Sequence, residues 1–267
     1  MRVCTLGDLL LDVIVRLEQP LEQGTDATAR TRTGAGGQAA NVAAWAASLG
    51  AETRFVGKRG DDPAGALAAG ELSRRGVTVL GPVVVGHNGV VVSLVGPDGD
   101  RAMASDRGVA PTLTAEELDP AWFEGVTHLH LSGYSVMSAP IDGAALEAAR
   151  LVRQGGGRIS VDLASTSVIR EFGSARLRER LDELAPELVF ANEQEREELG
   201  ATVDGTLVVK RGAGGCAVDG REFAAVPANV LDTTGAGDAF AAGYLVGGVE
   251  LALETAARCV AQLGAMP

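Results

Sequence analysis

The sequence has few cysteines, and those it has are widely separated. The 267 residues include three cysteines, Cys4, Cys216 and Cys259, and no two of them form a C-x-x-C pair. Disulfide frameworks and zinc ribbons need more cysteines at closer spacing. Neither is expected, and the pattern favours the reducing environment of the cytoplasm.

Basic residues are also scarce. There are 23 lysines and arginines against 35 aspartates and glutamates, a net charge of −12 at pH 7, and Lys58 and Lys210 are the only lysines. Duplex nucleic acid and anionic membrane surfaces attract basic proteins, so neither is expected as a main partner. This charge does not exclude a local site for an anion such as a nucleotide.

Long apolar runs and a targeting segment are missing as well. No stretch approaches the ~18 to 20 apolar residues that a membrane helix requires. The first residues reach Gly7 and Asp8 too early to form the apolar region of a signal peptide. We therefore expect a cytoplasmic protein.

The chain does have a core-forming composition, with 46% hydrophobic residues and 22% charged residues. Short β-branched runs alternate with stretches rich in alanine and leucine. Strands are expected at residues 3–6, 53–56, 128–131, 158–162, 188–191 and 206–210, and helices at 38–49, 63–75, 141–154, 175–184 and 193–199. Repeated strand–helix units predict a single α/β domain over residues 1–267, with a doubly wound, mostly parallel sheet and helices on both faces.

Two regions interrupt this alternation. Residues 12–33 contain no convincing helix, and residues 89–105 contain two extended runs around P-D-G-D at 97–100. Asp-Gly between extended runs is typical of a β-hairpin. We expect both regions to form antiparallel strands of a small inserted sheet, a lid over one end of the domain. Exposed strands are able to pair between subunits, so a homodimer through the lid is a further expectation.

The most informative segment is D-T-T-G-A-G-D at residues 232–238, followed by an apolar stretch that predicts a buried helix. A helix N-terminus presents free backbone N–H groups, and glycines let a phosphate approach them. Asp238 would lie beside that anion, where a carboxylate is better explained by proton transfer than by affinity. The alternative is a helix merely capped by Thr234. It leaves unexplained two glycines that each lower helix stability by up to ~1 kcal/mol relative to alanine.

A second glycine-containing segment, at residues 34–43, suggests an acceptor site. Gly36 and Gly37 allow close backbone approach, and Asn41 follows one helical turn later with an amide suited to sugar hydroxyls. The same segment satisfies a relaxed dinucleotide fingerprint, but alternating, charged residues precede it where a buried strand is required. The sequence contains no G-x-x-x-x-G-K-[ST], which excludes a P-loop kinase.

Together these segments resemble the signatures of the ribokinase-like (PfkB-type) carbohydrate kinases. The C-terminal signature is D-T-T-G-A-G-D-A-F at 232–240, the N-terminal signature begins at Gly34, and N-x-x-E occurs at 192–195. These blocks, with residues 7–12, follow the family order over essentially the whole chain. The resemblance implies an enzyme that transfers the γ-phosphoryl group of ATP, with Mg²⁺, to a hydroxyl of a sugar or sugar-like molecule.

The resemblance also implies roles for individual residues near the acceptor. Asp238 would be the catalytic base, and the backbone N–H groups of Gly235, Ala236 and Gly237 would form the anion hole. The residues expected to contact the acceptor are Asp12, Gly36, Gly37 and Asn41.

On the nucleotide side, Asn192 and Glu195 would organise Mg²⁺ and phosphates through water, although they also fit a helix capping box. Residues 208–215 resemble the family's T-x-G-x-x-G loop, with nucleotide contacts expected at Lys210, Gly212 and Gly215. Lys210 replaces the usual threonine, so it either contacts phosphates or is a strand-end charge. Asp232 and Thr234 match positions of a monovalent cation site, taken as K⁺, with residues 261–265 as the partner segment.

Two alternatives to a sugar kinase stay open at this stage. The same fold accepts nucleosides, but aromatic residues are only 4% of the chain and none is close in sequence to Asp12 or Asn41. The protein could also be a non-catalytic sensor of sugars or nucleotides. An intact Asp238 argues against that reading.

Overall fold

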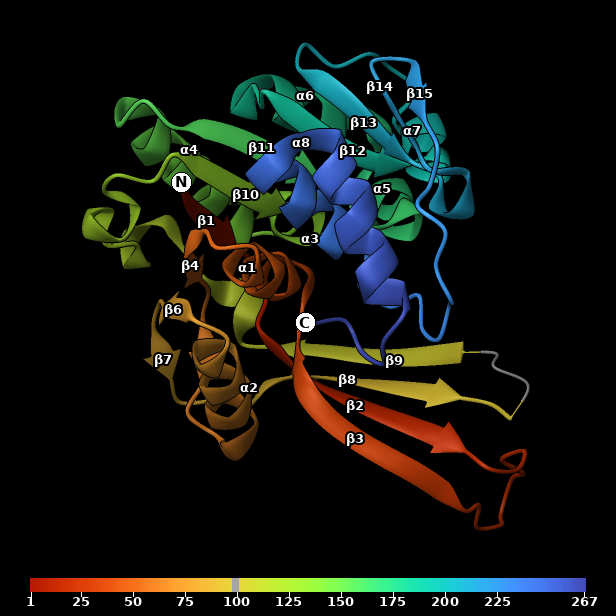
Figure 1. Ribbon diagram of the computed structural model, residues 1–267. Helices are drawn as coiled ribbons and strands as arrows, with labels where there is room; N and C mark the ends of the chain where they lie inside the picture. Colours follow the sequence, from red (N-terminus) through yellow and green to blue (C-terminus); the bar gives the residue numbers. More distant parts are fainter. Residues whose placement is uncertain (98–100) are drawn as a thin grey trace.

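The computed structural model describes residues 1–97 and 101–267, and its largest element is a nine-stranded sheet (Figure 1). The strand order is β15-β14-β13-β12-β11-β10-β1-β4-β6. Every pair from β6 to β13 is parallel, and the two pairs at the β15 edge are antiparallel. The strands are β1 (Arg2–Leu6), β4 (Glu52–Val56), β6 (Val77–Leu80), β10 (His128–Ser132), β11 (Arg158–Asp162), β12 (Leu188–Asn192), β13 (Thr206–Lys210), β14 (Cys216–Val218) and β15 (Arg221–Phe223).

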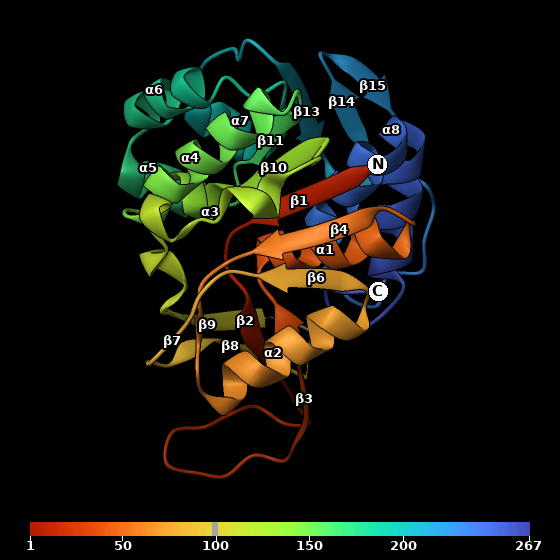
Figure 2. The ribbon, with the colours of Figure 1, turned by 90° about the vertical axis from the view of Figure 1, so that its left-hand side faces the viewer.

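Helices cover both faces of this sheet (Figure 2). On one face α1 and α8 pack through Trp45 and Phe240 onto strand residues such as Phe190. On the other face α4 and α6 bury Ile141 and Leu181 against the opposite sides of the same strands. The helices are α1 (Gln38–Ser48), α2 (Pro63–Arg74), α3 (Gly133–Val136), α4 (Ile141–Gln154), α5 (Thr166–Phe172), α6 (Ser174–Leu184), α7 (Glu193–Leu199) and α8 (Ala236–Val260).

The predicted fold class is confirmed, and all the expected strands and helices of the main domain are present with ends within one residue. The sequence pattern missed β6, β14, β15, α3 and α5, which are all short. It also missed the short elements that link the larger ones, namely β5 (Arg59–Gly60), β7 (Val83–Val84), η1 (Ala110–Thr112), η2 (Ala115–Glu117), η3 (Pro120–Phe123) and η4 (Gly212–Gly214).

A second, four-stranded sheet, the lid, projects from one end of the large domain (Figure 1). Its order is β3-β2-β8-β9, from β2 (Leu10–Leu17), β3 (Ala29–Gly36), β8 (Asn88–Val95) and β9 (Arg101–Gly108). These strands extend beyond the expected limits of 12–33 and 89–105. The turn expected at 97–100 depends on residues 98–100, which lie outside the described part of the chain.

The expectation that the lid is wholly antiparallel is wrong at its centre. The β2–β3 and β8–β9 pairs are antiparallel, but β2 and β8 run parallel. The reason is topological: after β3 the chain passes through α1, β4, α2 and β6 before it returns. It therefore enters β8 from the same end of the lid at which it entered β2.

Helix α8 is long and apolar enough, by length and composition alone, to cross a membrane, which is an exception to the expectation from the sequence. Gly247 and Gly248 have non-helical backbone angles, so α8 consists of two helical segments joined at a kink. Its residues Ala239, Ala241 and Ala242 are fully buried. The helix belongs to the core of the domain.

Candidate active site

Two predicted site residues, Asn192 and Lys210, lie with Asp162 at the carboxyl ends of the parallel strands, near the N-terminus of α8. Asp162 ends β11, Asn192 ends β12 and Lys210 ends β13. In open α/β sheets this edge is where ligands bind, because loops and helix N-termini converge there. The lid approaches the same edge through Asp12 of β2, whose charge acts on Asp238.

Asp238 and Asn41 are brought together from opposite ends of the sequence by the packing of α1 against α8. Asn41 Nδ2 donates a hydrogen bond of 2.7 Å to Asp238 Oδ2. Burial raises the pKa of Asp238 to about 7, and this hydrogen bond opposes the rise. Asp162 raises the same pKa further, whereas Lys210 lowers it. Asp238 is therefore a carboxylate able to accept a proton near neutral pH.

The backbone before Asp238 enters α8 through a glycine in the left-handed region. Gly235 is the N-cap of α8 with φ 76°, and a Cβ there would lie 2.6 Å from the Cβ of Ala265. Within the described residues, the N–H groups of Gly235 and Gly237 make no hydrogen bond. The N–H of Ala236 donates to Thr233 O at 3.3 Å. Two of the three expected amides are thus open to an anion, and the third closes a turn.

Lys210 supplies a positive charge at this same place. Its Nζ donates to Asp162 Oδ2 at 2.6 Å, and a Cβ on Gly237 would lie 3.2 Å from that Nζ. Burial disfavours the ammonium, but the carboxylates of Asp162 and Glu195 outweigh it and raise the pKa of Lys210. The lysine therefore stays charged beside the open amides.

Asn192 and Glu195 form the capping box of α7 that the sequence allowed. Glu195 accepts hydrogen bonds from Asn192 N and Nδ2, both at 2.8 Å, and Asn192 Oδ1 accepts from Glu195 N at 2.8 Å. Burial raises the pKa of Glu195, and the nearby Asp162 raises it further. Each oxygen of Glu195 already accepts one hydrogen bond, so its remaining capacity suits a water more than a bare metal ion.

The charges and side chains of the site indicate how a Mg²⁺ ion could be held there. The carboxylates of Asp162, Glu195 and Asp238 all act electrostatically on one cation, Lys210. The excess of negative charge would attract a further cation. Among the described residues there is no group of three or more His, Cys, Asp or Glu side chains arranged as a metal site. The residues therefore fit an ion that is held mainly by nucleotide phosphates and water.

The two glycines of the acceptor segment make close approaches within the protein itself. A Cβ on Gly36 would collide with the carboxylate of Asp12, and a Cβ on Gly37, which has φ 101°, would collide with Asp8 O. The glycines thus allow Asp12 to lie against the start of α1. Asn41 is 6% exposed, and its Oδ1 has no hydrogen-bond partner in the described part of the chain. That oxygen is available to a ligand.

The remaining predicted residues lie in two loops. Gly212 begins η4 and Gly215 follows it, both with positive φ, and a Cβ on Gly215 would collide with Phe223 O. Asp232 Oδ1 accepts from Thr234 N at 2.9 Å and from Thr234 Oγ1 at 2.6 Å, and its Oδ2 accepts from Gly264 N at 3.0 Å. Asp232 therefore fastens the segment after α8 to the loop before it.

Four further residues in this region, Asp8, Arg107, Tyr134 and Asp162, had no role assigned from the sequence. Asp162 pairs with Lys210. Arg107 forms a two-pronged ion pair with the buried Asp8, at 2.6 and 3.0 Å, and lies 5.6 Å from the ring centre of Tyr134. Burial raises the pKa of Tyr134, and the charges of Asp238 and Glu195 also act on it. Asp8, Tyr134 and Asp162 follow or end parallel strands, which is the signal that could have identified them.

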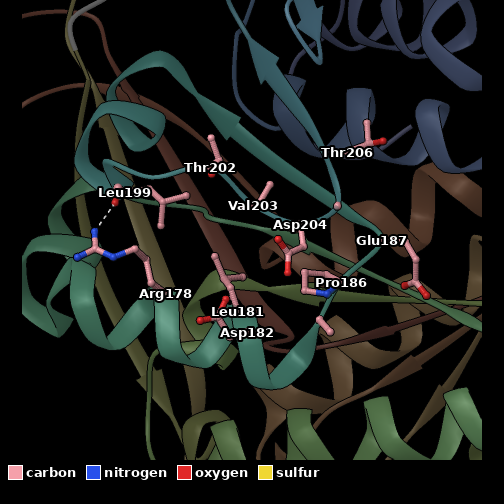
Figure 3. A pocket seen from close by; sticks show the side chains of 12 residues that line it. Arg178, Leu181, Asp182, Pro186, Glu187, Leu199, Thr202, Val203, Asp204 and Thr206 are labelled. Carbon is pink, nitrogen blue, oxygen red and sulfur yellow. Dashed lines mark hydrogen bonds between the residues drawn. The ribbon is translucent and has the colours of Figure 1, made fainter.

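A hollow of about 610 Å³ lies between α6, the segment that leads from α6 into β12, and the segment that joins α7 to β13 (Figure 3). Its lining includes the apolar Leu181, Pro186 and Val203 and the acidic Asp182 and Asp204. Thr206, at its edge, is the first residue of β13. The hollow is therefore at the amino ends of the strands, opposite the site, and it contains none of the predicted residues.

Comparison with known proteins shows which family the chain belongs to. The sequence matches the description "pfkB family carbohydrate kinase" over residues 1–266. The chain belongs to that family. The kinase is 33% identical over 279 residues to an ATP-dependent ribose-1-phosphate kinase from Halopiger xanaduensis, over 97% of this chain and 90% of the relative. It is 31% identical over 284 residues to a fructokinase from Escherichia coli, over 96% of this chain and 87% of the relative.

A solved structure has the same fold. The kinase superposes on a protein described as ribokinase II from Escherichia coli, in complex with ATP and Mg²⁺, with a TM-score of 0.80. That match covers 99% of this chain and 94% of the other at 23% identity, so it supports the fold. The expected family, fold class and carbohydrate kinase activity are confirmed.

The raised pKa of Asp238 predicts a pH-dependent effect on stability. Because the pKa is higher in the folded state than in the unfolded chain, the folded state is progressively disfavoured as pH rises from about 4 through about 7. Asp238→Asn removes this ionisation. We expect the melting temperature of the variant relative to the wild type to increase between pH 5 and pH 8, measured by calorimetry.

Asp26→Asn, at an exposed carboxylate, is the matched control and should show no such trend. If the difference in melting temperature between Asp238→Asn and the wild type is the same at pH 5 and pH 8, Asp238 is not a buried ionisable group.

Proposed function

We propose that this kinase transfers the γ-phosphoryl group of ATP to a hydroxymethyl group of a sugar or sugar-like molecule, with Asp238 as the base. The observation that carries the proposal is the position of the Asp238 carboxylate beside the open amides of Gly235 and Gly237. A hydroxyl group hydrogen-bonded to Asp238 would have a phosphoryl site immediately next to it.

In the proposed reaction, Asp238 accepts the proton of the acceptor hydroxyl as the new O–P bond forms. The bond between the γ-phosphorus and the β–γ bridging oxygen breaks, and ADP leaves with that electron pair. The amides of Gly235 and Gly237 donate to the phosphoryl oxygens, where charge is concentrated in such reactions. When bound, Mg²⁺ neutralises phosphate charge, and Asn192 and Glu195 would hold it through water.

On the acceptor side, we propose that Asp12 and Asn41 bind hydroxyl groups beside Gly36 and Gly37. The free Oδ1 of Asn41 supports this role, since Nδ2 of the same side chain is already bonded to Asp238. On the nucleotide side, the loop containing Gly212 and Gly215 follows β13, next to the charged end of Lys210. Closure of the lid over the acceptor would exclude water and limit ATP hydrolysis.

A nucleoside is the second candidate for the acceptor. Tyr134 favours it, because this aromatic residue follows β10 and its hydroxyl is within the electrostatic influence of Asp238. A sugar remains the first choice because the ring of Tyr134 is already faced by Arg107. A non-catalytic sensor is disfavoured by the proton-accepting environment of Asp238.

We also propose that a monovalent cation such as K⁺ binds beside Asp232 and Thr234, at the loop that leads into the anion hole. The contacts of Asp232 with residues before and after α8 support a site that orders this loop. Binding there would act on catalysis through the position of the Gly235 and Gly237 amides.

For the cellular location, we propose the cytoplasm, where the three free, buried cysteines would remain reduced.

The lid supports the proposal of a homodimer. Strand residues alternate between faces, so Val13, Val15 and Val92 share the face opposite Asp12. Leu17, Val90 and Leu94 extend the same face. Apolar residues on an outward sheet face favour burial against another sheet, and a second copy of the lid offers an identical surface.

The catalytic proposal predicts ATP turnover with one or more members of a panel of pentoses, hexoses, sugar acids, sugar phosphates and nucleosides. Asp238→Asn should lower kcat roughly 10²- to 10⁴-fold, the range typical of a lost general base. For the wild type, kcat/KM should rise with pH through about 7, as Asp238 loses its proton. A coupled ADP-release assay measures both, and full activity of Asp238→Asn would show that another group is the base.

The dimer proposal predicts that Val15→Glu combined with Val92→Glu converts a dimer to a monomer, because each chain would then bury charge in the interface. Analytical ultracentrifugation at micromolar concentration measures the change. Gln154→Glu, at an exposed position at the end of α4, should leave the dimer intact. A wild-type chain that sediments as a monomer would overturn the proposal.

A further inference from the structure

Asp162 and Lys210 form an ion pair in the candidate active site. We propose that Asp162 positions Lys210 so that its ammonium contacts the transferring γ-phosphoryl group and favours triphosphate over diphosphate binding. Lys210 is then a catalytic residue, and Asp162 is a positioning residue that acts through it. The inference rests on the proposed kinase function and adds a specific pair of side chains to it.

The pair joins two strands that are not neighbours in the sheet. Asp162 ends β11 and Lys210 ends β13, and both strands pair with β12. The lysine side chain must therefore reach across the end of β12 to place its Nζ 2.6 Å from Asp162 Oδ2. This path brings the ammonium away from its own strand and toward the N-terminus of α8.

The ammonium lies directly against the open face of the anion hole. A Cβ added to Gly237 would be 3.2 Å from Lys210 Nζ and 3.8 Å from its Cε. The N–H of Gly237 has no partner among the described residues. A phosphoryl oxygen that accepts from this N–H would therefore have a positive charge close by. Glycine at 237 leaves room for both the lysine and the phosphoryl group.

Burial and charge explain why the pair stays together. Asp162 is fully buried, and its other observed bond is from Ala164 N at 3.2 Å. Loss of its cation would leave a buried carboxylate uncompensated, which is strongly unfavourable. Asp162 therefore holds Lys210 firmly in one place. An ammonium has three donors, and one is used by Asp162, so two remain for phosphoryl oxygens.

The choice of lysine is itself informative in this chain. Only Lys58 and Lys210 are lysines among 23 basic residues. An ammonium is a compact point charge with three donors, whereas a guanidinium is planar and larger. Lys58 is also largely buried and is bound to Glu117 at 2.7 Å and to Thr112 O at 3.0 Å. It provides a matched buried ion pair that is not attached to the anion hole.

The test measures dissociation constants for AMP-PNP and for ADP, each with Mg²⁺, by isothermal titration calorimetry. Lys210→Met should weaken AMP-PNP binding by about 10-fold or more, the usual size for a hydrogen bond to a charged group, and should change ADP binding much less. Lys58→Met should leave the ratio of the two constants unchanged. An unchanged ratio in Lys210→Met would overturn the role of this lysine.

Variants of Asp162 test the positioning role. Asp162→Asn should lower the preference for AMP-PNP in the wild-type background but not in the Lys210→Met background, because it acts only through the lysine. Asp162→Glu keeps the ion pair but displaces the ammonium, so it should also lower the preference. Normal preference in Asp162→Glu, or an equal effect of Asp162→Asn in both backgrounds, would overturn it.

These outcomes separate the inference from the proposed function. A wild-type protein that binds neither nucleotide contradicts both. A wild-type protein that binds both nucleotides and transfers phosphate, while Lys210→Met retains the same preference, contradicts the inference alone. Calorimetric melting of each variant verifies that the compared proteins are folded.

Discussion

The contact between Asn41 and Asp238 is the interaction on which the rest of the site depends. It joins the first turn of α1 to the first turn of α8 and so fixes the two helix N-termini relative to each other. The buried face of each helix, with Trp45 on α1 and Phe240 on α8, packs on the same side of the large sheet. The core thus holds a carboxylate and an amide at hydrogen-bond distance although 197 residues separate them.

A second constraint is the crowding of negative charge around a single lysine. Asp162, Glu195 and Asp238 would repel one another when ionised, and burial raises the pKa values of Glu195 and Asp238. Lys210 offsets part of this cost. The rest of the electrostatic repulsion between the carboxylates is present when no substrate is bound. A nucleotide bound with its metal ion would change the charge of the site. Such a site is less stable than an apolar one and is suited to moving a proton.

Much of the architecture could be predicted from local patterns, because the main strands are apolar, β-branched runs and the main helices are stretches of residues that favour helix. The shorter elements lacked such a signal. The β14–β15 hairpin turns at Asp219 and Gly220, a dipeptide of the same kind that suggested the lid hairpin, but its strands have three residues each. The parallel β2–β8 pair could not be predicted, since it depends on the path of the whole chain between them.

The site was predictable where residues are close in sequence and less so where the fold assembles them. Asp238 and its glycines form one segment, so their chemistry could be argued directly. Asp162 and Tyr134 each end or follow a strand without a distinctive motif, and only the order of strands brings them beside Lys210 and Asp238. The Asn192–Glu195 motif stayed ambiguous for a physical reason: its helix cap and its proposed phosphate role use the same atoms.

The most direct test of the account is a crystal structure with Mg-ADP, aluminium fluoride as a mimic of the phosphoryl group in transfer, and an acceptor found by screening. We expect the fluoride within hydrogen-bond distance of the Gly235 and Gly237 N–H groups, and the acceptor hydroxyl on Asp238. A mimic bound elsewhere, or an Asp238 carboxylate turned away from the acceptor, would contradict the mechanism.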